Sequence, residues 1–111
     1  MLTIELLQNL GANTKDGLGR CLNNETMYLK FVNMALEDAN FERLSRAIAA
    51  DDRHDAFEAA HALKGVLGNL SLTPLYETAS EMTELLRTQK DADYSAYLEK
   101  LLAKRDELKN A

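Results

Sequence analysis

Hydrophobic positions recur at intervals of three and four residues along most of the chain, which is the period of an amphipathic helix. The clearest stretch runs from about Asp52 to Leu70, where the apolar positions are spaced by 4, 3, 4 and 3 residues. This spacing is typical of a helix packed in a bundle. No stretch of useful length alternates with period two, so no strand is predicted. The apolar stripe consists of Ala56, Ala60, Leu63, Leu67 and Leu70.

Capping residues divide the N-terminal half into further helices. The segment from Leu2 to Leu10 is predicted to be a short helix that ends at Gly11, and the glycine-rich stretch 11–19 is predicted to be a loop. Asn24 and Asn40 are placed to cap the next two helices. The expected inward positions of these two helices are Tyr28, Phe31, Val32, Ala35, Leu36, Phe41, Leu44 and Ile48.

The C-terminal half contains three helix starts. One residue of the pair Asp51–Asp52 can cap the stripe helix, and Thr73 can cap the next one with Pro74 at its first position. Asp91 or Asp93 can start the last helix. Short connections join these long helices, so neighbouring helices should run antiparallel. The expected inward positions after residue 73 are Leu75, Ala79, Met82, Leu86, Tyr94, Leu98, Leu101 and Leu108.

The pattern therefore predicts an all-α fold, an up-and-down antiparallel four-helix bundle with one or two short extra helical segments at the N-terminus. A chain of 111 residues suits one domain over residues 1–111. A net charge of -5 disfavours nucleic acid as a partner. Cys21 is the only cysteine and is expected to be a small buried or half-buried residue. A single cysteine and the lack of a membrane span or signal peptide favour a cytoplasmic protein. A monomer is the simplest expectation.

His61 stands on the opposite side of the stripe helix. At roughly 100° per residue it lies roughly 140° from the direction of the stripe, which predicts an exposed imidazole. Gly65 and Gly68 leave the helix backbone bare beside it. A glycine inside a helix costs about 1 kcal/mol relative to alanine, so another requirement should explain them. We interpret the bare face as an approach for a partner protein; close packing of a neighbouring helix is the alternative.

Lys64 lies one helical turn after His61, on the flank between core and solvent. A neutral imidazole is a competent nucleophile, because its pKa is about 6.5. Phosphoryl transfer needs mainly positioning and positive charge, and a lysine at i+3 can reach a phosphate on the ring. Lys64 can also be an ordinary surface lysine. Phe57 is a candidate for partner binding, with an edge position in the core as the alternative reading.

The segment His61-Ala62-Leu63-Lys64-Gly65-Val66-Leu67-Gly68 resembles the motif of the histidine-containing phosphotransfer (HPt) family. That motif is histidine, any residue, leucine, lysine and glycine, with a small residue two to three positions on. The likeness extends through Leu70 and the helix from Pro74 and, more weakly, back to residues 17–20 and 28–29. Many members have a third glycine at the position of Ser71.

The resemblance implies that His61 accepts a phosphoryl group from the aspartyl phosphate of a response-regulator receiver domain and passes it to another receiver. A sensor histidine kinase would supply the group, directly or indirectly, and Lys64 would stabilise its charge. The protein would be a carrier without a kinase or hydrolase site and without a cofactor, since the receiver would hold the Mg²⁺. A chain from Met1 to Ala111 would be a free-standing module of the bacterial type.

Other functions compete with this interpretation. Glu58 and His61 have the spacing of a di-iron ligand pair, but the chain lacks the second pair that such a site needs. A hydrolase built on Cys21 and His61 would need an oxyanion hole that bundles rarely form. A helical adaptor without phosphoryl chemistry is the main alternative, and it predicts that His61→Gln leaves function intact. A phosphoacceptor domain served directly by a histidine kinase stays within the family resemblance.

Overall fold

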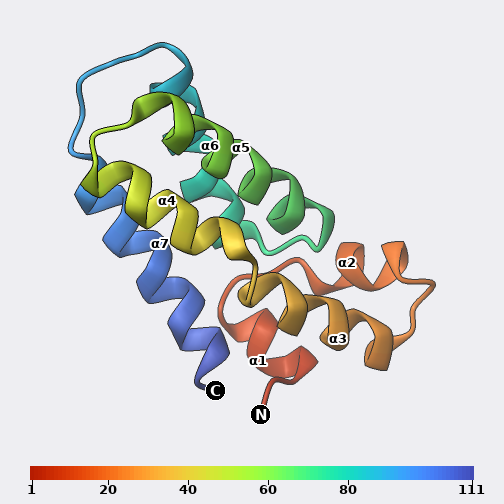
Figure 1. Cartoon of the computed structure of the whole chain (residues 1–111). Helices are drawn as coiled ribbons and strands as arrows, with labels where there is room; N and C mark the ends of the chain where they lie inside the picture. The colour runs from red at the N-terminus through yellow and green to blue at the C-terminus, as the bar shows by residue number, and fades with distance from the viewer.

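The computed structural model describes residues 1–111 and contains seven helices and no strand (Figure 1), which confirms the all-α prediction. Most boundaries lie within a few residues of those expected from the pattern. The helices are α1 (Ile4–Asn9), α2 (Thr14–Arg20), α3 (Glu25–Leu36), α4 (Ala39–Ala49), α5 (Arg53–Asn69), α6 (Thr73–Arg87) and α7 (Tyr94–Lys109).

Helices α4, α5, α6 and α7 form the predicted up-and-down antiparallel bundle (Figure 1). Helix α5 packs against both α4 and α6, and α7 contacts α6, α4 and α3. The three N-terminal helices gather at one end of the bundle, where α2 lies beside the turn that joins α5 to α6 (Figure 1). This arrangement brings the N-terminal segment next to the C-terminal end of the stripe helix.

One hydrophobic core runs through the molecule and includes every residue of the predicted stripe. The inward positions predicted for α6 are all buried, as are most of those in α3, α4 and α7. Phe31 is the exception, since it is 40% exposed on the outer side of α3, and the prediction for it is wrong. Ile48 and Leu98 are half-buried and pack against the edge of the core.

Several helix caps match the sequence prediction. Asn24, Asp52 and Asp93 each accept a hydrogen bond from a backbone N–H in the first turn of α3, α5 and α7. Asn40 is not a cap, because the earlier Asp38 takes that position and accepts the N–H of Asn40 at 2.8 Å.

Thr73 is not the cap of α6 either. The helix already begins at Thr73, with Leu72 in the cap position and no side-chain cap bond. The threonine hydroxyl instead donates to the carbonyl of Ser71 at 3.3 Å. Pro74 lies in the first turn of the helix, where its missing N–H costs no hydrogen bond.

The predicted loop over residues 11–19 is wrong, since helix α2 occupies most of it. Asn13 caps this helix by accepting the N–H of Asp16 at 3.2 Å. Gly17 lies inside the helix, and a Cβ placed there would come within 2.5–2.7 Å of the Tyr28 ring. Helix propensity disfavours glycine here, but the close approach of Tyr28 requires it. Tertiary packing therefore outweighs the local signal.

Helices α4, α5 and α6 end in left-handed residues that are not glycine, namely Asp51, Ser71 and Gln89. After α5, the N–H of Ser71 donates to Gly68 and that of Leu72 donates to Leu67, both at 3.1 Å. These two hydrogen bonds form a Schellman motif, in which backbone N–H groups that follow a helix donate to its last free carbonyls. It turns the chain sharply at Ser71.

None of the seven helices has the length and apolar composition needed to cross a membrane.

Candidate functional site

His61 projects from α5 into solvent, on the side of the helix away from the buried stripe. Neither of its ring nitrogens has a hydrogen-bond partner within the chain. The imidazole stacks on Phe57, with ring centroids 5.7 Å apart and planes inclined by 21°. The ring is thus supported on one side while both nitrogens stay open to a reaction partner.

Lys64 follows one turn later and is half-buried. No carboxylate lies within ion-pair distance of its ammonium group, although eight ion pairs occur elsewhere in the chain. Its field reaches α6, because the pKa of Glu84 is lowered mainly by the hydrogen bond from Arg87 and in smaller part by Lys64. A lysine with a partly buried stem and an unpaired head can bind an incoming anion.

His61 and Lys64 line an open concavity of about 550 Å³, which we call the His61 hollow. Its lining is almost entirely polar, with Tyr76 as a large side chain on the α6 side. Four separate pieces of the chain contribute to it: α2, α5, the α5–α6 turn and the start of α6. The lining residues are Asn13, Asp16, Arg20, His61, Lys64, Gly65, Gly68, Asn69, Ser71, Thr73 and Tyr76.

The two glycines of the predicted bare face differ from one another. A Cβ on Gly65 would meet nothing within 4 Å, so this position is open. A Cβ on Gly68 would come within 3.0 Å of two Tyr76 ring carbons. Gly68 therefore has the packing contact named above as the alternative, and Gly65 does not. Gly68 still lines the hollow.

Phe57 lies at the edge of the core and reaches the surface beside His61. Its ring is half-buried and packs against the hydrophobic core. The same ring stacks on His61, and its exposed part borders a second shallow depression lined by Arg53, His54 and Arg87. A ring in this position can fix the imidazole and still offer an apolar edge at the surface.

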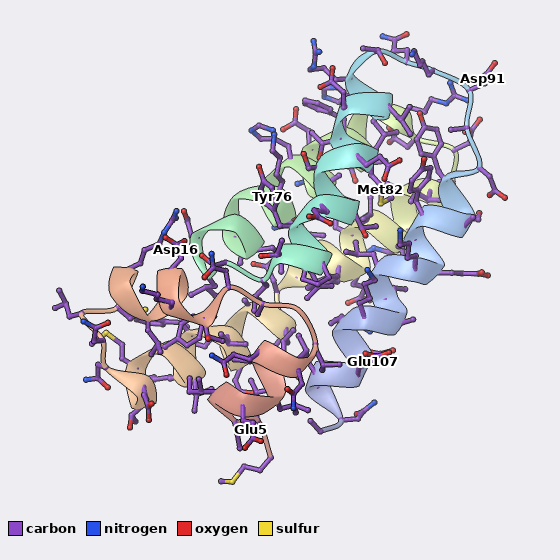
Figure 2. The ribbon with its side chains drawn as sticks, turned by 180° about the vertical axis from the view of Figure 1, so that it is seen from behind. Glu5, Asp16, Tyr76, Met82, Asp91 and Glu107 are labelled. Carbon is purple, nitrogen blue, oxygen red and sulfur yellow. The ribbon has the colours of Figure 1, made fainter.

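The residues that α2 contributes to the hollow were not predicted from the sequence. Asn13, Asp16 and Arg20 lie far from His61 in sequence, and their segment was assigned to a loop. Figure 2 shows Asp16 on α2, at the end of the bundle where α5 turns into α6. The one local signal was the pair Asn13 and Asp16, since a cap residue followed three positions later by an acidic residue is a helix start.

Asn13, Asp16 and Arg20 form one side of the hollow, which we call the α2 wall. Hydrogen bonds join this wall to the α5–α6 turn. The N–H of Asn13 donates to the carbonyl of Ser71 at 2.9 Å, and the Ser71 hydroxyl donates to the Asp16 carboxylate. The buried phenol of Tyr28 donates to the carbonyl of Leu70 at 2.8 Å. Burial, with smaller effects of Cys21 and Asp16, raises the pKa of Tyr28 to about 12, so the phenol keeps its proton.

The metal and hydrolase alternatives find no assembled site. No group of three or more His, Cys, Asp or Glu side chains is close enough to hold a metal ion. Cys21 is buried in the core and does not line the His61 hollow. The arrangement at His61 offers an accessible nucleophilic nitrogen, an unpaired cation one turn away and space for a group of phosphate size.

Comparison with known families decides the identity of this bundle. A family model described as Hpt domain matches residues 27–111, which is most of the chain. The chain belongs to the Hpt domain family. Membership implies histidine phosphotransfer within a phosphorelay, as part of two-component signal transduction, and contact with receiver domains and kinases. Hpt domains are phosphocarriers without catalytic activity of their own.

The match to the Hpt domain covers α4 to α7, and it therefore contains His61 and Lys64. It begins inside α3, so α1 and α2 lie outside it. A search of the curated proteins found no significant match, and neither did a search of the solved structures. One wall of the His61 hollow thus comes from a segment that the family model does not cover.

Proposed function

We propose that this Hpt domain accepts a phosphoryl group on His61 from the aspartyl phosphate of a receiver domain and passes it to a second receiver. The observation that carries the proposal is the His61 hollow, where an exposed imidazole without hydrogen-bond partners lies beside an unpaired lysine. The only other histidine, His54, is exposed on the same helix but lies outside the hollow.

The transfer has simple chemistry on this chain. A ring nitrogen of His61 attacks the phosphorus atom, an N–P bond forms, and the P–O bond to the receiver's aspartate breaks. The aspartate leaves as a carboxylate, and the proton on the other ring nitrogen can pass to water. In the second half-reaction the ring takes a proton back, another carboxylate attacks the same phosphorus, the N–P bond breaks and the imidazole leaves as a neutral ring. Positioning and charge stabilisation supply most of the acceleration in such reactions.

Lys64 is the residue that we assign to charge stabilisation. The phosphoryl group in transit spreads negative charge over three oxygens, and an ammonium group one turn from the ring can donate to one of them. The Mg²⁺ used in such transfers would be held by the receiver, and this chain would supply no cofactor.

Gly65 and Phe57 are assigned to partner docking. The space above Gly65 allows another backbone to approach α5 closely. Phe57 offers the exposed edge of a half-buried ring next to His61. Gly68 contributes to docking indirectly, because it leaves room for the Tyr76 ring to approach α5 at the border of the hollow.

Transfer from a phosphorylated receiver tests the proposal. The purified receiver, phosphorylated with labelled phosphate, is mixed with wild-type protein, His61→Gln and His54→Gln. We expect an acid-labile, base-stable label on the wild-type protein and His54→Gln, and no label on His61→Gln.

The outcome also separates the proposal from its rivals. Labelling by a kinase and ATP but by no receiver would favour a kinase-served phosphoacceptor domain. A chain that no receiver or kinase from the same cell labels would favour a helical adaptor and contradict the proposal.

A further inference from the structure

The α2 wall of the His61 hollow carries a second cation. Arg20 is the last residue of α2 and lines the hollow together with Lys64, which belongs to α5. The two cations thus reach the same space from different elements. Arg20 lies outside the stretch matched by the Hpt family model.

The guanidinium of Arg20 is held from one side only. Its Nε lies 3.3 Å from an oxygen of Asp16, one turn earlier on the same helix. Its two terminal nitrogens donate no hydrogen bond within the chain. With Nε beside Asp16, these two nitrogens remain free as a fork, which suits two oxygens of a phosphoryl group.

Asp16 is itself held by the α5–α6 turn. The carboxylate accepts the hydroxyl of Ser71, and the backbone of Asn13 donates to the Ser71 carbonyl at 2.9 Å. A chain of contacts therefore runs from the end of the His61 helix through Ser71 and Asp16 to Arg20. Both contacts fall on the same oxygen of Asp16, whose side chain stays half-exposed, so the carboxylate positions Arg20 while it keeps part of its own charge.

Ser71 has a backbone conformation that is uncommon for residues other than glycine. Its φ of +55° lies in the left-handed region, where glycine is favoured. A glycine there would suit the turn but could not hold Asp16. The serine hydroxyl gives a reason for a non-glycine residue at this place, since it links the turn to the α2 wall.

We infer that Arg20 is a second phosphate-binding side chain of the His61 hollow, with Asp16 and Ser71 as positioning residues. The inference rests on the proposed function, because the ligand is the phosphoryl group carried by His61. Lys64 would bind the group from α5 and Arg20 from α2, so that its oxygens are held from two sides. This wall gives the N-terminal segment a role in the phosphorylated state.

The test needs no partner protein. Phosphoramidate phosphorylates histidine directly, since the ring nitrogen forms the N–P bond while ammonia leaves. The ³¹P signal that is absent in His61→Gln belongs to the phosphorylated His61. Its chemical shift is then followed against pH in the intact chain, which gives the pKa between the singly and doubly charged phosphoryl group.

A bound cation favours the doubly charged form and lowers this pKa. We expect Arg20→Gln to raise the pKa by about 0.5 unit, which corresponds to one charge about 6 Å from the phosphoryl group and screened as in water. Arg20→Lys should restore most of the shift. Lys15→Gln is the matched control, because Lys15 is an exposed cation on the same helix that does not line the hollow.

Ser71→Gly tests the positioning residues. The substitution relieves the cost of a left-handed backbone at residue 71, and it removes the hydrogen bond to Asp16. The melting temperature should therefore change little. The ³¹P titration should still move in the same direction as for Arg20→Gln, by a smaller amount. A purely structural role of Ser71 predicts no such movement.

The inference is overturned if Arg20→Gln and Lys15→Gln shift the titration equally, if neither shifts it, or if phosphoramidate leaves His61 unlabelled. Failure of the proposed function looks different. In that case no phosphorylated receiver labels the wild-type protein, whereas the dependence of the ³¹P titration on Arg20 in chemically labelled protein persists.

Discussion

Gly65 and Gly68 lie on the same face of α5, but glycine is present at the two positions for different reasons. The helical wheel placed both away from the core, and both do line the hollow. Only the structure shows that Tyr76 comes down from α6 onto Gly68, because that contact joins two helices and leaves no trace in local spacing. Gly65 has no neighbour within the chain that requires a glycine, which supports the proposed role in docking.

This difference predicts opposite effects on stability and function for Gly65→Ala. The alanine removes the helix penalty of glycine and should raise the free energy of unfolding by up to about 1 kcal/mol. Its methyl group projects toward the approaching partner, so transfer from a receiver should slow. Urea unfolding and transfer kinetics measure the two effects.

The matched control for that prediction is Gly19→Ala, since a Cβ there also meets open space but lies outside the hollow. It should leave the transfer rate unchanged. If Gly65→Ala transfers as fast as Gly19→Ala, the space above Gly65 has no role in docking.

Lys64 carries a second prediction at the scale of single residues. Lys64→Ala removes the unpaired cation and should slow transfer to His61 by about tenfold or more, as loss of one charge-stabilising donor does in other group transfers. Lys100→Ala removes an equally charged, exposed lysine from α7 and should have no effect. The rate of transfer to His61 and the thermal melting curve are measured for both variants and compared. A loss of helicity in Lys64→Ala would assign it a structural role instead.

At the scale of helices, the joint between the N-terminal segment and the bundle depends on one buried side chain. Tyr28 of α3 lies under Gly17 of α2 and donates to the carbonyl of Leu70 at the end of α5. Three helices therefore meet at a single phenol. The pKa of Tyr28 is raised to about 12, chiefly by burial.

The raised pKa of Tyr28 predicts a loss of stability at high pH. The unfolded chain loses the phenol proton near its ordinary value of 10.0, whereas the folded chain keeps it up to about 12. The contribution is fully present below pH 10.0 and is lost as pH rises through about 12.

Tyr28→Phe is the variant that isolates this contribution. Its free energy of unfolding should be lower than that of the wild type near neutral pH, because a buried hydrogen bond worth about 1 kcal/mol is lost. The difference should shrink between pH 10.0 and 12, and a constant difference across that range would contradict the burial of the phenol.

Helix starts and inward faces were largely predictable, because caps and apolar periods are local signals. The stripe of α5 and the caps Asn24, Asp52 and Asp93 follow directly from the sequence. Asp38 was missed because two polar residues competed for one cap. Helix α2 was missed for a different reason: the glycine that argued against it is required by a tyrosine in the next helix.

At the scale of the whole molecule, the N-terminal helices and the bundle share one core. The same buried cluster includes Leu7 of α1, Tyr28 of α3 and Leu67 of α5. The exposure of His61 followed from the wheel, but the hollow around it did not. Its α2 wall depends on a hydrogen bond between Asp16 and Ser71, 55 residues apart, which no periodicity reports.

The shared core predicts that residues 1–111 unfold as one unit. Urea curves from far-ultraviolet circular dichroism and from tyrosine absorbance should coincide. Leu7→Ala, which removes a fully buried side chain from α1, should shift both curves together by about 2 to 4 kcal/mol. Separate transitions would mean that the N-terminal helices are an independent unit.

The central claim is that His61 carries the phosphoryl group, and ring-nitrogen NMR tests it most directly. The chain has only two histidines, so a ¹H–¹⁵N spectrum of the imidazoles contains two ring systems. After addition of a phosphorylated receiver, we expect the His61 ring alone to shift and to show coupling to phosphorus. The shift should reverse when excess unphosphorylated receiver is added with Mg²⁺. An unchanged His61 ring, or a phosphorylated His54, would contradict the account.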